Sequence, residues 1–157
     1  MQRESVSQSL SELAFDFFFW FSRFEAALKE NNFLKSRKVG EKAKPDWDLF
    51  SAAFASKYVL TVCAKRLISM APETQIVAGT EGGLDWIVTK TTWCKSDLQR
   101  ITFLLRTVRN NLFHGAKHGS ATWDNPERTA DVLQTALLAL NEIASLSGLA
   151  PDYERKY

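Results

Sequence analysis

The feature that most constrains the fold is a long stripe of apolar residues near the start of the chain. Between about Ser7 and Phe33, apolar residues recur at intervals of three and four, which is the period of an α-helix with one buried face. They are Leu10, Leu13, Ala14, Phe17, Phe21, Phe24 and Leu28. The spacing predicts a long helix at the centre of a helical bundle.

Three aromatic residues of this helix, Phe15, Phe19 and Trp20, lie off the stripe. The helix is therefore aromatic on more than one side, and we expect a second cover, either another helix or another subunit. The most apolar stretch, residues 13–21, contains Asp16 and is far shorter than the roughly 20 residues of a membrane-spanning helix. No membrane segment is expected.

A basic segment follows. Residues 35–45 contain five Lys or Arg, Gly40 and Pro45, without apolar periodicity, which predicts an exposed basic loop. A solvated connector is the simpler interpretation, and contact with phosphate is the alternative.

Helical patterning resumes over Asp46–Met70 and predicts a second long helix that ends before Pro72. Over residues 72–95 the pattern fails, and three glycines separate two short β-branched runs. We expect an irregular connection there, with a short helix at 84–88.

Two further helices have clear boundaries. Ser96 or Asp97 can cap one that ends near Gly115, and Asn125 followed by Pro126 begins another that ends at Gly148. The sequence thus predicts an all-α fold for residues 1–157, a single-domain bundle of four to five helices.

Cysteine usage and the start of the chain predict a cytoplasmic location. Cys63 and Cys94 are the two cysteines, and their surroundings indicate neither a disulfide framework, a zinc site nor a nucleophilic thiol. No basic segment followed by an apolar core begins the chain, which argues against a signal peptide. The formal charge of +2 is too small to indicate nucleic-acid binding by itself, so the positions of the basic residues matter more.

The helix that begins near Asp97 carries a polar ridge opposite its apolar face. Arg106, Asn110 and His114 are spaced by four, and Arg109 lies at the edge of the ridge. At the helix end the macrodipole favours a protonated His114 while the arginines oppose it, so we expect its pKa near neutrality, as a general acid or base requires. RNA cleavage by the 2′-hydroxyl needs such a group and cationic support for the phosphate, and it needs no metal.

Arg109 and His114, separated by Asn-Asn-Leu-Phe, resemble the Arg-x4-6-His motif of the HEPN superfamily, including the polar residue directly after the arginine. The resemblance implies a HEPN-like bundle and an endoribonuclease whose composite active site forms between two subunits of a homodimer. Arg109 would bind phosphate, Asn110 would position it and His114 would act as acid or base. By the same analogy, Arg106 and Lys117 would contact RNA.

Phe103 and Phe113 also project on the motif side of this helix. They predict a covered surface, either the dimer interface or a second intramolecular core face. In some HEPN toxins a tyrosine two residues after the motif histidine is modified by a paired enzyme; here Ala116 occupies that position, which puts regulation by that route in doubt.

Two function classes follow. The first is a metal-independent ribonuclease, a toxin or phage-defence effector without a cofactor, with RNA as substrate and an antitoxin or another defence-system protein as a further partner. The second is a non-catalytic helical module that binds nucleotide, nucleic acid or a protein. A metal site at His114 and His118 is disfavoured because Gly115 and Gly119 interrupt the helix that would align them.

Overall fold

The computed structural model describes residues 8–79, 82–114 and 125–154. These residues form six helices and one two-stranded sheet. In chain order the elements are α1 (Gln8–Glu30), α2 (Trp47–Phe54), α3 (Val62–Ser69), β1 (Glu73–Ala78), β2 (Gly83–Val88), α4 (Asp97–His114), α5 (Pro126–Leu146) and α6 (Ala150–Tyr153).

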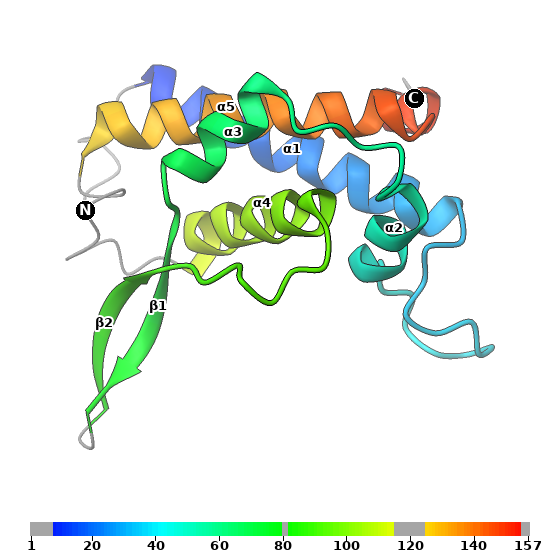
Figure 1. The fold of residues 1–157 in the computed structure, drawn as a ribbon, viewed down its shortest axis with the longest axis horizontal. Helices are drawn as coiled ribbons and strands as arrows, with labels where there is room; N and C mark the ends of the chain where they lie inside the picture. Colours follow the sequence, from blue (N-terminus) through cyan, green and yellow to red (C-terminus); the bar gives the residue numbers. More distant parts are fainter. Residues whose placement is uncertain (1–7, 80–81, 115–124, 155–157) are drawn as a thin grey trace.

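Three long helices, α1, α4 and α5, enclose the core. Figure 1 shows α1 and α5 running in the same direction, with α4 running opposite to both. The predicted stripe of α1 supplies the buried Phe17, Phe21, Phe24 and Leu28. They pack with buried residues of α4 and α5, and α3 lies against α5 while α2 lies against α4. The predicted long first helix at the centre of a bundle is confirmed.

The prediction of an all-α fold is wrong. β1 and β2 pair antiparallel, from Glu73 opposite Val88 to Ala78 opposite Gly83, within the region expected to be an irregular connection with a short helix. The hairpin projects from the helices (Figure 1). β-branched residues favour extended backbone, and Gly79 after β1 and Gly82 before β2 have φ values of 88° and 77°, which glycine adopts without strain. The signal was present in the two β-branched runs and the glycines between them.

The predicted second long helix is also divided. α2 ends at Phe54 and α3 begins at Val62, so one apolar pattern covers two short helices. The Thr61 side chain accepts a hydrogen bond from the backbone of Ala64 and caps α3. Tyr58, Val59 and Thr61 are poor helix formers, and a threonine that caps a new helix ends the preceding pattern.

The other helix boundaries are confirmed. The Ser96 hydroxyl accepts from the backbone N–H of Gln99 at the start of α4. Asn125 caps α5 by accepting from Glu127 and Arg128, with Pro126 at the first helical position. α5 ends at Leu146, and Gly148 follows with a φ of 72°.

The off-stripe aromatics of α1 have different surroundings. Trp20 packs against Tyr153 of α6, with ring centroids 4.9 Å apart, so another helix supplies its cover. Phe15 and Phe19 stack on each other and stay 64% and 44% exposed.

Candidate functional site

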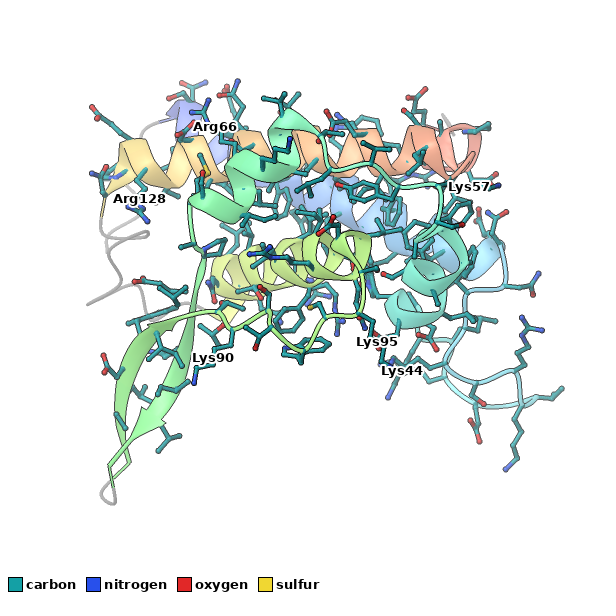
Figure 2. All side chains as sticks on the ribbon, in the orientation of Figure 1. Lys44, Lys57, Arg66, Lys90, Lys95 and Arg128 are labelled. Carbon is teal, nitrogen blue, oxygen red and sulfur yellow. The ribbon has the colours of Figure 1, made fainter. Side chains whose placement is uncertain are left out.

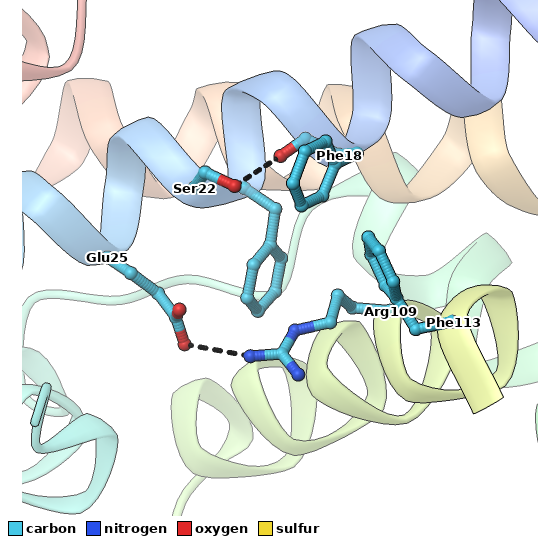
Figure 3. A pocket seen from close by; sticks show the side chains of 6 residues that line it. Phe18, Ser22, Glu25, Arg109 and Phe113 are labelled. Carbon is cyan, nitrogen blue, oxygen red and sulfur yellow. Dashed lines mark hydrogen bonds and ion pairs between the residues drawn. The ribbon is translucent and has the colours of Figure 1, made fainter.

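Arg109 is the centre of the candidate site. Its side chain extends from α4 toward α1, where Nη2 lies 3.5 Å from Glu25 Oε1 (Figure 3). The guanidinium carbon lies 5.2 Å from the ring centroid of the buried Phe21, and Nη1 donates to Asn110 Oδ1 at 3.0 Å. These contacts hold the guanidinium in one place, with its side chain 31% exposed.

Glu25 is a site residue that sequence reasoning did not find. Its Oε1 accepts from Trp47 Nε1 at 3.1 Å as well as facing Arg109, so it joins α1, α2 and α4. Glu25 and Arg109 are 84 positions apart, and no motif links them. The available signal was a single carboxylate beside the apolar stripe of α1, which is usually only a solvated residue.

The predicted residues Arg106, Arg109 and Asn110 line one pocket with four lysines. This basic pocket has a volume of about 490 Å³ and contains six cationic side chains and one carboxylate. Its lining residues are Glu25, Lys29, Lys35, Lys42, Ala43, Lys44, Pro45, Trp47, Arg106, Arg109 and Asn110. Such a concentration of positive charge favours a phosphate group.

The lysines of the basic loop reach the pocket because the two ends of that loop are paired. Lys35 N donates to Lys44 O at 3.0 Å, Leu34 and Pro45 form an antiparallel bridge, and Asp46 N donates to Phe33 O at 2.8 Å. At the far end the chain turns through Gly40, whose φ of 89° suits glycine. The sequence predicted an exposed basic loop, and in the structure this loop lies beside α4, the helix that carries Arg109 and Asn110.

Two predicted site residues lie partly or wholly outside the described residues. His114 is the last residue of α4, on the same helix as Arg109 and Asn110, and its side chain is outside the description. Lys117 lies outside the described residues altogether. The structure therefore brings together Arg106, Arg109 and Asn110.

The two phenylalanines predicted for an interface occupy different surroundings. Phe103 packs edge-on against Trp93, which precedes α4, with centroids 4.8 Å apart. Phe113 contacts Phe18 of α1 at 4.8 Å and is 50% exposed. Within this chain Trp93 covers Phe103, and Phe18 covers Phe113 only in part.

A second pocket lies on the other side of Arg109. This aromatic pocket has a volume of about 290 Å³ and is lined by Phe18, Phe21, Ser22, Glu25, Arg109 and Phe113 (Figure 3). Glu25 and Arg109 line both pockets, so the basic pocket and the aromatic pocket adjoin at this ion pair.

The thiols are poorly suited to nucleophilic chemistry. Burial raises the pKa of Cys63, and the nearby Glu142 carboxylate raises it further. Burial also raises the pKa of Cys94. A raised pKa lowers the thiolate fraction at neutral pH. Within the described ranges no group of three His, Cys, Asp or Glu side chains is arranged to hold a metal ion.

Comparisons with protein-family models, with curated proteins and with solved structures found no match. Across the part of the chain that the structure describes, no helix combines the length and the apolar character needed to cross a bilayer.

Proposed function

We propose that this protein is a metal-independent endoribonuclease of the HEPN type that acts at a composite site in a homodimer. One observation carries the proposal: Arg109 and Asn110 of the sequence motif, and Arg106 of the same polar ridge, line a basic pocket together with four lysines. A motif that had arisen by chance on a helix surface would have no reason to lie beside lysines that come from α1 and from the basic loop.

The arrangement suits a phosphate beside Arg109. The distance of 3.5 Å to Glu25 is longer than that of a strong charge-assisted hydrogen bond. The guanidinium has five N–H donors, of which Glu25 and Asn110 engage only a part. The remaining donors can bind phosphate oxygens, while Glu25 and Phe21 keep the planar group oriented.

The reaction uses the nucleophile of the substrate itself. The 2′-oxygen bonds to phosphorus and gives its proton to a base, and the bond from phosphorus to the 5′-oxygen breaks as that oxygen receives a proton from an acid. The products are a 2′,3′-cyclic phosphate and a 5′-hydroxyl. Arg109 and Asn110 stabilise the charge that develops on the phosphate oxygens, and His114 transfers a proton.

A homodimer supplies the second proton-transfer group. Cleavage needs a base and an acid, and the motif provides one histidine per chain. On an ideal helix, residues 109 and 114 differ by about 140° in direction and by ~7.5 Å along the axis, which separates them for action on one phosphate. A partner's motif facing this one provides the missing group.

The test is RNA cleavage in EDTA by wild type, His114→Ala and Arg109→Ala. Lys90→Ala is the matched control, because this exposed lysine follows β2 and does not line the basic pocket (Figure 2). Wild type and the control should cleave RNA, and the two motif variants should not. Intact RNA at high wild-type concentration, or equal cleavage by all four proteins, would contradict the proposal and favour a non-catalytic binding module.

Such an activity fits a toxin or phage-defence effector of the cytoplasm, held in check by an antitoxin or another defence-system protein. Expression of the wild type in bacteria should arrest growth, and expression of His114→Ala should not. Equal growth of the two strains at equal protein level would contradict this role.

A further inference from the structure

The basic and aromatic pockets together match the two halves of a nucleotide. A nucleotide joins a charged phosphate to a flat base, and here a basic pocket of about 490 Å³ adjoins an aromatic one of about 290 Å³ through Arg109 and Glu25. The smaller volume lies near the lower end of the range for small-molecule sites, which suits one base rather than a larger ligand.

The aromatic pocket presents two exposed rings. Phe18 and Phe113 are 40% and 50% exposed, and their rings are tilted by 59° with centroids 4.8 Å apart. The buried Phe21, which also lines this pocket, packs against the Arg109 guanidinium. Exposed aromatic side chains beside a phosphate-binding cation are the usual platform on which single-stranded bases stack.

Two oxygen groups at the pocket wall can accept hydrogen bonds from a base. The Ser22 hydroxyl donates to Phe18 O at 2.9 Å, so its own oxygen remains an acceptor. Glu25 contributes a carboxylate, which accepts at two oxygens. Guanine presents two neighbouring donor groups on one edge, N1–H and N2–H, whereas adenine and cytosine present one amino group there and uracil one N–H.

We propose that the aromatic pocket binds a guanine base of the RNA substrate and so makes cleavage selective for guanine next to the bound phosphate. The inference rests on the proposed function, because it places the phosphate of the same nucleotide beside Arg109. It also gives Phe113 a contact with a base, where the sequence predicted a surface covered either by the partner subunit or by a second core face of this chain.

The experiment measures equilibrium binding to the full chain by calorimetry. The probes are guanosine monophosphate as 3′ and 5′ isomers, the corresponding adenosine, cytidine and uridine nucleotides, and ribose 5-phosphate, which has no base. The better guanosine isomer should bind about tenfold more tightly than ribose 5-phosphate and than the other nucleotides. Phe18→Ala and Phe113→Ala should each remove most of this advantage.

The matched control is Phe15→Ala. Phe15 is an exposed phenylalanine of α1, the helix that carries Phe18, and it does not line the aromatic pocket. It should bind guanosine monophosphate as the wild type does. Ser22→Ala should lower the preference for guanosine over adenosine nucleotide. The substitution removes only the side-chain hydroxyl, so the backbone hydrogen bonds of α1 remain. Circular dichroism melts check that each variant is folded.

Four results would overturn the inference. They are equal affinity for guanosine monophosphate and ribose 5-phosphate, absence of binding to any probe, a loss in Phe15→Ala as large as in Phe113→Ala, and conversion of a dimer to a monomer by Phe113→Ala in sedimentation. Cleavage that depends on His114 but shows no preference among bases would support the ribonuclease and contradict the guanine pocket. Selective binding of guanosine monophosphate without RNA cleavage would support the guanine pocket and contradict the ribonuclease.

Discussion

Asn110 and Asn111 are adjacent in α4 and face different parts of the molecule. Asn110 is exposed, lines the basic pocket and accepts from Arg109. Asn111 is 8% exposed, and its Nδ2 donates to Glu73 O of β1 at 2.6 Å. Successive helical residues point about 100° apart, so one amide serves the pocket and the next connects the helix to the hairpin.

These contacts predict opposite phenotypes for two alanine variants. Asn111→Ala removes the donor to a partly buried carbonyl and should lower the free energy of unfolding by about 1–3 kcal/mol. Asn110→Ala should change this free energy by less than about 0.5 kcal/mol and still lower the cleavage rate. Urea denaturation and the EDTA cleavage assay measure the two effects. Equal loss of stability in both variants would show that the exposed amide also supports the fold.

Among the elements, the basic loop contributes most to the charge of the pocket. Lys35 is partly neutralised, since its Nζ lies 3.9 Å from Asp46 and 3.7 Å from Asp48. Lys42 and Lys44 line the same pocket and are exposed. We therefore expect these two lysines to account for most of the loop's attraction for RNA phosphate.

A double variant, Lys42→Ala with Lys44→Ala, tests the role of this loop in binding. Each phosphate contact to single-stranded RNA contributes about 0.7 to the slope of log affinity against log salt, so the slope should fall by about 1.4. Fluorescence anisotropy with cleavage-deficient His114→Ala protein measures it. The control changes Lys57 and Lys90, which lie on other segments (Figure 2) and should leave the slope unchanged. A slope that falls equally in both would indicate non-specific attraction.

At the scale of the whole molecule, a composite site makes a prediction about mixed subunits. His114→Ala protein should be inactive alone. A heterodimer of wild type and His114→Ala holds one of the two histidines that the composite site needs and should also be inactive, so subunit exchange in an equal mixture should lower the cleavage rate to about half its value before exchange. Cleavage kinetics before and after subunit exchange measure this loss. An unchanged rate in a mixture that sediments as exchanged dimers would indicate that each chain cleaves RNA by itself.

Much of the helical framework could be predicted because its signals are local. The apolar stripe of α1 gives its period, and the caps at Ser96 and Asn125 fix the starts of α4 and α5. The division between α2 and α3 was not predicted because the apolar residues continue across it. The one signal of a new helix there is the side chain of Thr61, which caps α3. The hairpin was missed because short β-branched runs with glycine also occur in irregular loops.

The candidate site was only half predictable for a related reason. Arg106, Arg109 and Asn110 lie on one helix, so helical geometry brings them together. Packing between elements distant in sequence brings the other lining residues to the two pockets beside Arg109. These residues include Glu25, Phe18 and the loop lysines. A single sequence carries no signal for such pairings when the residues, a carboxylate and several lysines, are common on any surface.

The hairpin leaves and re-enters the helical body at nearly the same point. Thr89 N donates to Pro72 O at 2.9 Å, and the hydroxyls of Thr74 and Thr89 lie 2.6 Å apart. A hairpin whose two ends lie side by side can change length without moving the helices before and after it. The entropic cost of closing a loop grows only slowly with the number of residues in it. Residues near 79–82 are therefore a place where the chain can accept an inserted peptide, such as an epitope or a fluorophore-labelling tag, while the site on α4 keeps its geometry.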